Sequence, residues 1–102
     1  MTYDYELTLI TQSSGTNADA DPIIVEEETV ILCGLNSVGR SEFYAAAATG
    51  LRPELVFTIH GYEYDGQQLV EFDGVRYKVL RTYGTGYEEL ELTCQREAGA
   101  SG

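Results

Sequence analysis

The sequence predicts a mainly β protein: a small antiparallel β-barrel or sandwich of about six strands, with one short helix inserted between strands 2 and 3. Three observations predict it. Short apolar runs alternate with polar residues at a period of two, tight-turn residues separate these runs, and one stretch alone has a helical composition. The 102 residues suit one domain. We expect that domain to span residues 1–97, followed by a disordered tail over residues 98–102.

The first two predicted strands cover residues 3–10 and 23–35. The first alternates polar and apolar side chains, and the second is rich in β-branched residues. Residues 11–22 between them are polar and end in Pro22, so we expect a flexible loop there. Glu26 to Glu28 interrupt the second strand and predict a bulge or a solvated rim, because three successive acids cannot all face a core.

The helix is predicted over residues 41–48. Ser41 can cap its N-terminus, Glu42 suits the positive end of the helix dipole, and four alanines propagate it. Gly50 offers a left-handed stop and Pro53 prevents the helix from resuming. A helix of about two turns is marginal alone. We therefore expect it to dock on the barrel or to become ordered in an assembly.

The chain after Pro53 returns to strands and tight turns. The predicted strands cover residues 55–60, 68–72, 75–83 and 87–94. Asp73-Gly74 has the composition of a two-residue hairpin turn, and Gly84-Thr85-Gly86 turns the chain once more.

The charge of the chain is strongly acidic. It contains 17 acidic and six basic residues, for a net charge of −11, and no Lys or Arg precedes Arg40. Such a surface repels phosphate backbones and lacks the basic stripe of a nucleic-acid-binding protein. Three interpretations stay open: solubility, the wall of a channel along which DNA slides, and mimicry of DNA by a protein that occupies a basic groove.

The two cysteines and the N-terminus indicate where the protein is made. Cys33 and Cys94 lie in apolar strand runs without a dense cysteine framework, so we expect buried free thiols in a reducing cytoplasm. Residues 1–10 alternate in polarity and carry Asp4 and Glu6, unlike a signal peptide. These features favour synthesis in a bacterial-type host cytoplasm.

No motif predicts chemistry. His60, the single histidine, ends a strand without a nucleophile motif, and a structural role is favoured. Four oxygen-bearing side chains have the spacing of a calcium loop, but Pro22 stands where such a loop needs glycine, so chance spacing is favoured. They are Asn17, Asp19, Asp21 and Glu28. We expect no catalytic residues, no cofactor and no metal, and therefore no enzyme.

The order of several short segments is distinctive. They are Ser41-Glu42-Phe43-Tyr44 at the helix start, Gly50-Leu51-Arg52-Pro53-Glu54 at its exit, Tyr62-Glu63-Tyr64-Asp65-Gly66, Val70-Glu71-Phe72-Asp73-Gly74, and Arg81-Thr82-Tyr83. In this order they resemble the phage head–tail joining family, also called head-closure, head-completion or stopper proteins. The resemblance covers most of the chain outside residues 11–21.

The resemblance implies a structural virion protein. Members of the family are small β-barrels that form a neck ring below the portal, close the DNA-filled head, retain the genome and present the surface to which the tail attaches. It implies a homo-oligomeric, twelve-fold ring in the virion neck. The implied partners are further copies of the chain, a portal or adaptor ring, a tail terminator, and passing DNA that is bound without sequence specificity.

The resemblance and the residue types together suggest candidate site residues. Residues 36–52 correspond to the family's inserted gate segment, with Ser41, Glu42, Phe43 and Tyr44 as candidate gate residues. Acids of a channel wall repel DNA, which makes Glu26, Glu27 and Glu28 candidate lumen residues, although a solvated outer face explains them equally well. Tyrosines and arginines suit subunit contacts, although any one tyrosine can instead be half-core. The candidates for such contacts are Tyr44, Arg52, Tyr62, Tyr64, Arg81 and Tyr83.

Two other functions stay open. Another neck or tail ring, such as a tail-terminus component, can use a barrel of the same size. An inhibitor that mimics DNA is supported by the net charge alone.

Overall fold

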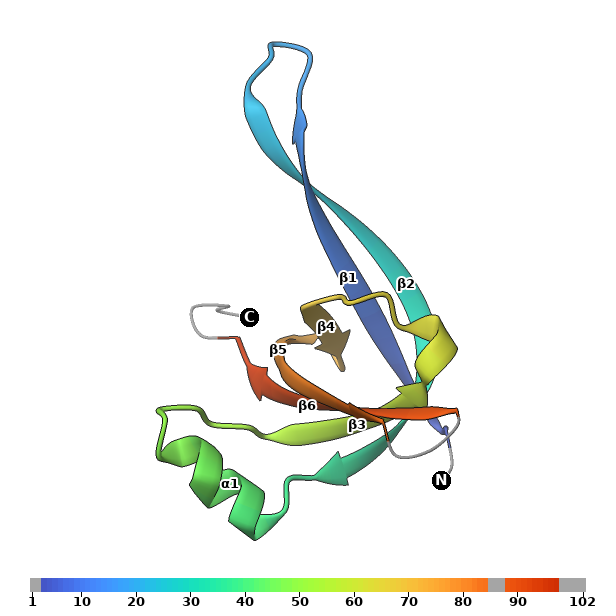
Figure 1. Cartoon of the computed structure of the whole chain (residues 1–102). Coiled ribbons are helices and arrows are strands. Elements are labelled where there is room, and N and C mark those ends of the chain that lie inside the picture. Colours follow the sequence, from blue (N-terminus) through green and yellow to red (C-terminus); the bar gives the residue numbers. More distant parts are fainter. Residues whose placement is uncertain (1–2, 85–87, 98–102) are drawn as a thin grey trace.

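Six strands form one closed antiparallel barrel in the order β1-β2-β3-β6-β5-β4 (Figure 1). The structure, a computed structural model, describes residues 3–84 and 88–97. Along the chain its elements are β1 (Tyr5–Thr16), β2 (Pro22–Ser37), α1 (Arg40–Ala47), β3 (Leu55–His60), the 3₁₀ turn η1 (Gly61–Glu63), β4 (Leu69–Phe72), β5 (Val75–Gly84) and β6 (Glu89–Arg96).

The predicted fold class is confirmed. The fold is mainly β, the helix lies between the second and third strands, and the sheet is a closed barrel. The predicted tail over residues 98–102 and part of the predicted turn, Thr85-Gly86, lie outside the described residues.

The core fills the barrel with inward-facing side chains from all six strands. Phe57 of β3 lies at its centre, with ring centroids 5.3 Å from Phe72 and 5.9 Å from Tyr77. Alternate residues of the strands surround it, as the period of two predicts. The buried cluster consists of Leu7, Leu9, Ile31, Cys33, Phe57, Ile59, Val70, Tyr77, Val79, Leu92 and Cys94.

The predicted hairpin turn between β4 and β5 is confirmed by its backbone. Asp73 and Gly74 have φ values of +54° and +78°, the left-handed pair that a type I′ turn requires. This turn matches the twist of the flanking strands and places Phe72 opposite Val75. Aspartate tolerates the left-handed region better than most residues, and glycine enters it without steric cost.

The predicted loop over residues 11–22 is wrong for residues 11–16 and Pro22, which are strand, and residues 17–21 form the turn between the two strands. β1 continues to Thr16, β2 begins at Pro22, and the two strands pair residue for residue from Ile10↔Glu28 to Thr16↔Pro22. The pattern of polarity does not reveal this ladder, because both faces of the ribbon are exposed to solvent and polar and apolar residues need not alternate along it. We call residues 11–28 the arm; it projects from the barrel as a two-stranded ribbon (Figure 1).

The pairing of the arm also decides between the two alternatives for the acidic run. The register of Glu26, Glu27 and Glu28 with β1 is unbroken, so the strand carries no bulge there. All three residues are exposed to solvent. The run is therefore solvated.

A bulge occurs instead in β5. Its register with β6 shifts between Val79 and Arg81, so Leu80 is an extra residue in the ladder. Val79 faces the core, and a regular strand would turn Arg81 inward as well. The bulge reverses that phase and sets Arg81 opposite Thr93, on the outer face beside α1.

The central packing predicts a large effect of removing one buried side chain. Leu92 is fully buried in β6, so Leu92→Ala should lower the free energy of unfolding by about 2–5 kcal/mol. Val30→Ala, at a residue 61% exposed on β2, is the control and should change it by less than about 0.5 kcal/mol. Urea unfolding followed by circular dichroism measures both. Equal losses in the two variants would contradict the assigned core.

Candidate functional site

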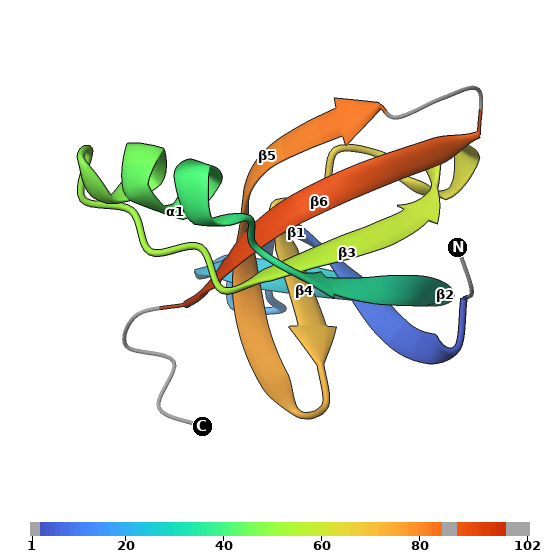
Figure 2. The same ribbon diagram turned by 90° about the horizontal axis from the view of Figure 1, so that it is seen from below.

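The segment predicted to act as a gate lies outside the barrel wall. Figure 2 shows α1 beside β5 and β6, clear of the barrel interior. None of its eight residues is fully buried, and Tyr44 is exposed. A helix this short has little stability of its own, so the contacts that hold it to the barrel decide its position.

Polar contacts at both ends of the segment hold α1 in place. The Glu42 carboxylate forms an ion pair with Arg81, with an N–O distance of 2.6 Å, and accepts a longer hydrogen bond from the Thr93 hydroxyl at 3.4 Å. After the helix, the backbone N–H of Arg52 donates to the Gln95 side-chain oxygen at 2.7 Å. Glu42, a predicted gate residue, and Arg81, a predicted interface residue, therefore meet.

The predicted cap of this helix is wrong, whereas the predicted stop is confirmed. The helix begins at Arg40 with Gly39 as N-cap and has no side-chain cap, so Ser41 lies within the first turn. Ser41 cannot cap a helix that starts before it. At the other end Gly50 has φ +85°, and the backbone N–H groups of Gly50 and Leu51 donate to Ala47 and Ala46 in the pattern of a Schellman motif.

A groove separates α1 from the barrel wall. Its volume is about 320 Å³. Its lining is mostly apolar and comes from α1, the chain that follows α1, and the bulged part of β5. The apolar lining residues are Ala45, Ala46, Leu51, Pro53 and Leu80, and the Glu42–Arg81 pair and Thr93 complete the walls.

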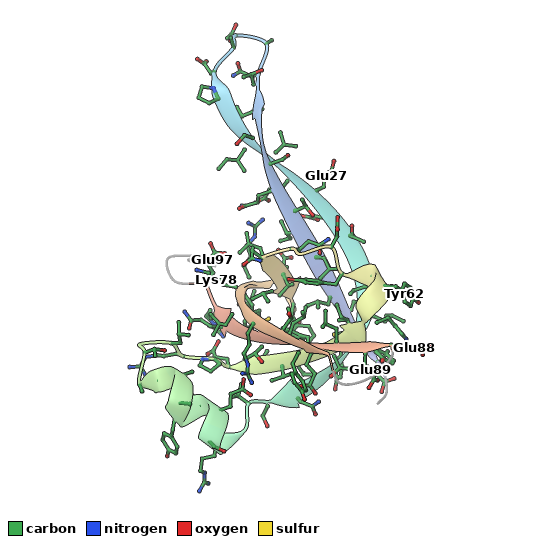
Figure 3. All side chains as sticks on the ribbon, in the orientation of Figure 1. Glu27, Tyr62, Lys78, Glu88, Glu89 and Glu97 are labelled. Atoms are coloured by element: carbon green, nitrogen blue, oxygen red, sulfur yellow. The ribbon has the colours of Figure 1, made fainter. Side chains whose placement is uncertain are left out.

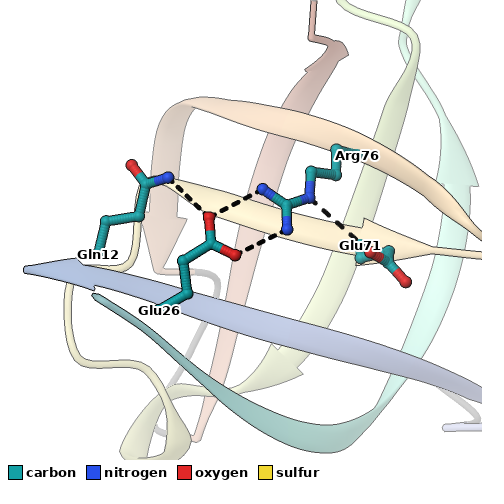
Figure 4. Close-up of polar contacts among 4 residues, drawn as sticks. All are labelled: Gln12, Glu26, Glu71 and Arg76. Atoms are coloured by element: carbon teal, nitrogen blue, oxygen red, sulfur yellow. Dashed lines mark hydrogen bonds and ion pairs between the residues drawn. The ribbon is translucent and has the colours of Figure 1, made fainter. Parts of the chain in front are cut away.

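The three candidate lumen acids have different surroundings. Glu26 forms two hydrogen bonds with the Arg76 guanidinium, at 2.8 and 2.9 Å, and accepts a third from Gln12 at 2.9 Å (Figure 4). Glu71 lies on the other side of the same guanidinium, at 3.9 Å. This network joins the base of the arm to the β4–β5 hairpin. Glu26 is therefore part of the scaffold.

The charge network lowers the pKa of the Glu26 carboxyl from 4.5 to about 2, because the hydrogen bonds from Arg76 and then Gln12 favour its ionised form. Glu27 and Glu28 are exposed and, among the described residues, form no ion pair. Figure 3 shows Glu27 on the flank of the arm. Of the three candidate lumen acids, Glu26 is therefore the one that an ion pair joins to the barrel within the described residues.

The predicted subunit-contact residues are spread over the molecule. Arg52 and Arg81 lie beside the groove, and Tyr83 is exposed near the end of β5. Tyr62 is 82% exposed in η1 and points away from the barrel (Figure 3). Tyr64 differs: it is half-buried against the core and its hydroxyl donates to the Gln67 carbonyl at 2.6 Å. For Tyr64, the alternative that a tyrosine belongs partly to the core therefore applies.

A contact that the sequence did not reveal fixes the start of β1. The Tyr3 ring stacks on His60 with centroids 4.2 Å apart, and its hydroxyl donates to Glu89 at 2.6 Å. That hydrogen bond raises the pKa of Tyr3 to about 12. The Nδ1 atom of His60 lies 3.4 Å from Glu63. The histidine thus joins the N-terminal residues to β3 and β6, which agrees with its predicted structural role.

The calcium-like spacing has a structural explanation in the turn of the arm. The side-chain oxygen of Asn17 accepts hydrogen bonds from the backbone N–H groups of Asp19 and Asp21, at 2.9 and 3.0 Å. Such a turn uses asparagine for its own backbone geometry. Within residues 3–84 and 88–97, no group of three or more His, Cys, Asp or Glu side chains is arranged to hold a metal ion.

The cysteines are free and buried, as predicted. Cys33 and Cys94 both belong to the core cluster. Burial raises the pKa of the Cys33 thiol to about 11 and that of Cys94 to about 12, so both stay protonated and unreactive near neutral pH.

An exposed apolar run on the arm was missed by the sequence analysis. Ile23, Ile24 and Val25 were assigned to a strand, but the structure places them on the arm, 39%, 71% and 40% exposed. The sequence does contain a signal of this exposed run, because three successive β-branched residues follow a polar stretch without alternation. Large apolar side chains gathered on an exposed element are typical of a contact surface.

No helix in the described part of the chain combines the length and the apolar character that crossing a membrane requires.

The ion pair between Glu42 of α1 and Arg81 of β5 predicts a local effect of Arg81→Gln. An exposed ion pair contributes about 0.2–1 kcal/mol, so protection of the α1 amides from hydrogen exchange should fall by up to about fivefold. Arg76→Gln is the control, because its ion pair joins β5 to Glu26 of the arm and involves no residue of α1 or of the chain that follows it. Hydrogen–deuterium exchange by mass spectrometry measures both variants. Unchanged α1 exchange in Arg81→Gln would show that the ion pair does not hold the helix.

The charge network predicts the titration of Glu26. Its folded-state pKa lies below the ordinary value, so the network stabilises the fold above a pH of about 4.5 and this stabilisation is lost as the pH falls toward about 2. Arg76→Gln should return the Glu26 pKa toward 4.5, measured by NMR of the side-chain carboxyl carbon. Lys78→Gln, on the same strand, should leave it unchanged. A Glu26 pKa that is the same in both variants would refute the bidentate pair.

Comparisons with known proteins add no assignment. No protein-family model matches the chain, and no curated protein matches it. The barrel, the arm, the α1 segment and the groove are therefore the basis on which function is proposed.

Proposed function

We propose that this chain is a structural subunit of a tailed bacteriophage. Copies of it assemble into a neck ring that closes the DNA-filled head below the portal, retains the genome and presents the attachment surface for the tail. The ring lies in the virion neck and contacts a portal or adaptor ring on one side and a tail terminator on the other. The subunits are made in the host cytoplasm.

One observation carries the proposal: a closed six-stranded barrel bears a helical segment between β2 and β3. The order of the sequence segments that resembles head–tail joining proteins supports it. A barrel is a rigid unit without open edges, so copies can be stacked side by side around a pore. The segment from residue 36 to 52 lies outside the wall on a few polar contacts. A segment held in this way can move without unfolding the barrel.

The charge supports passage of DNA without tight binding. The chain carries a net charge of −11, and Glu27 and Glu28 are exposed at the base of the arm. Acids on a channel wall repel phosphates over a distance of about 8–10 Å at physiological salt. A wall that attracted phosphates would slow ejection of the genome.

Deletion of the gene from its phage tests the proposal. We expect DNA to be packaged normally, the filled heads to lose DNA and lack tails, and the infectious titre to fall by orders of magnitude. A plasmid copy of the gene should restore the titre. Cryo-electron microscopy of complete virions should show a ring of barrels in the neck.

Other outcomes of the same experiment would overturn the proposal. Stable filled heads with tails of abnormal length would assign the chain to the tail terminus. Normal virions, together with tight binding of the purified protein to a basic nucleic-acid enzyme, would assign it to the DNA mimics. Either result is incompatible with a neck ring that closes the head.

A further inference from the structure

The arm has the properties of an element that lacks its partner. Within residues 3–84 and 88–97, β1 pairs with β2 alone beyond Ile10, and β2 pairs with β3 from Gly34 onward. A two-stranded ribbon is marginally stable in water by itself. The Glu26–Arg76 network supports the base of the arm, but its outer half has no such support among the described residues.

The apolar side chains of the arm are arranged as a contact surface. Ile23 and Val25 lie on one face, with Gly15 opposite Ile23 on β1. A Cβ atom at Gly15 would lie 3.2 Å from a methyl group of Val25, so the glycine leaves room for the two side chains to lie across the ribbon. Ile24 points to the other face and is 71% exposed. Burial of such side chains against a partner would stabilise the contact, because it removes apolar surface from water.

The groove beside α1 offers a matching surface elsewhere on the same chain. Its walls carry Ala45, Leu51 and Leu80, and Leu51 is among the exposed apolar residues of the molecule. Arg81 lines the groove, and Arg52 directly follows Leu51. Glu42 also lines the groove and pairs with Arg81, so the positive charge without an ion-pair partner among the described residues is that of Arg52, beside the groove. The groove is therefore apolar inside, with one basic side chain at its edge.

The arm is acidic, Arg52 lies beside the groove, and the two surfaces lie far apart. Asp19 and Asp21 precede the apolar run of the arm, Glu26–Glu28 follow it, and the arm contains no Lys or Arg. Figure 1 shows the arm and α1 at opposite ends of a molecule whose longest dimension is 49 Å. The arm therefore cannot reach the groove of its own chain, and two arms repel each other.

We propose that Ile23–Val25 of one copy dock in the groove between α1 and β5–β6 of a second copy. The two surfaces differ, so the contact is head-to-tail, and each copy keeps a free arm and a free groove for further neighbours. A contact of this kind closes into a ring or continues as a filament. It rests on the proposed function, because it specifies how the subunits of the neck ring are joined.

Docking would also fix the position of α1. The helix forms one wall of the groove, and its polar contacts with the barrel are few. An arm seated between helix and barrel adds apolar contacts to both. The segment proposed to act as a gate would then be ordered by the neighbouring subunit.

Pairwise disulfide cross-linking of two variants that each carry one added cysteine tests the contact. Ile24→Cys and Ala45→Cys, one of them carrying a mass tag, are mixed and oxidised at high concentration in physiological salt. Cys33 and Cys94 are fully buried and do not interfere. We expect the disulfide between arm and groove in several-fold excess over either homodimer. Val30→Cys replaces Ile24→Cys in the control, because Val30 is on the same strand and exposed but lies outside the arm.

The outcomes separate the contact from the proposed function. A random mixture of hetero- and homodimers, or equal yields with Val30→Cys, would overturn the docking of the arm even if virions contain a neck ring of this chain. A specific arm–groove disulfide in a protein whose deletion leaves head closure intact would support the contact and overturn the neck function. Association of copies should increase the protection of the α1 amides from hydrogen exchange, and Ile24→Ser, which leaves the buried core untouched, should remove this increase.

Discussion

β4 meets β1 over three residue pairs, from Thr8↔Glu71 to Ile10↔Leu69, and this short ladder closes the sheet. Closure removes the two free edges that an open six-stranded sheet would have and seals the core around Phe57. Because β4 is only four residues long, its ladder ends at Ile10 while β1 continues. The length of β4 thus determines where the barrel stops and the arm begins.

The barrel could be predicted from the sequence because most of its strands have one buried face, whereas β3 is buried on both faces and forms a short, nearly continuous apolar run. Alternation in β1, β5 and β6 and the Asp73-Gly74 turn identified most of the ladder. The arm could not be predicted in this way, since Ser13 and Ser14 have no buried face and their strand is held by backbone pairing with β2. The bulge at Leu80 was also missed, although the basic residues change phase there, from Lys78 to Arg81.

The candidate site was predicted in part. Residue type identified Glu42 and Arg81 separately, but their pairing depends on the bulge and on the position of α1. In the same way, nothing local distinguishes Glu26 from Glu27: the base that binds Glu26 is Arg76, fifty residues later in the chain. Tyr62 and Tyr64 are two residues apart and differ in burial because the chain leaves η1 between them.

The two bare edges of the arm have a consequence for the free protein. An exposed strand edge with apolar side chains is a template for uncontrolled pairing and aggregation. In this chain the run Ile23–Val25 is bounded by aspartates on one side and three glutamates on the other. These acids act as gatekeepers, because edge-to-edge pairing of two arms would bring like charges together. The acids on both sides of Ile23–Val25 thus disfavour pairing between the arms of two free copies.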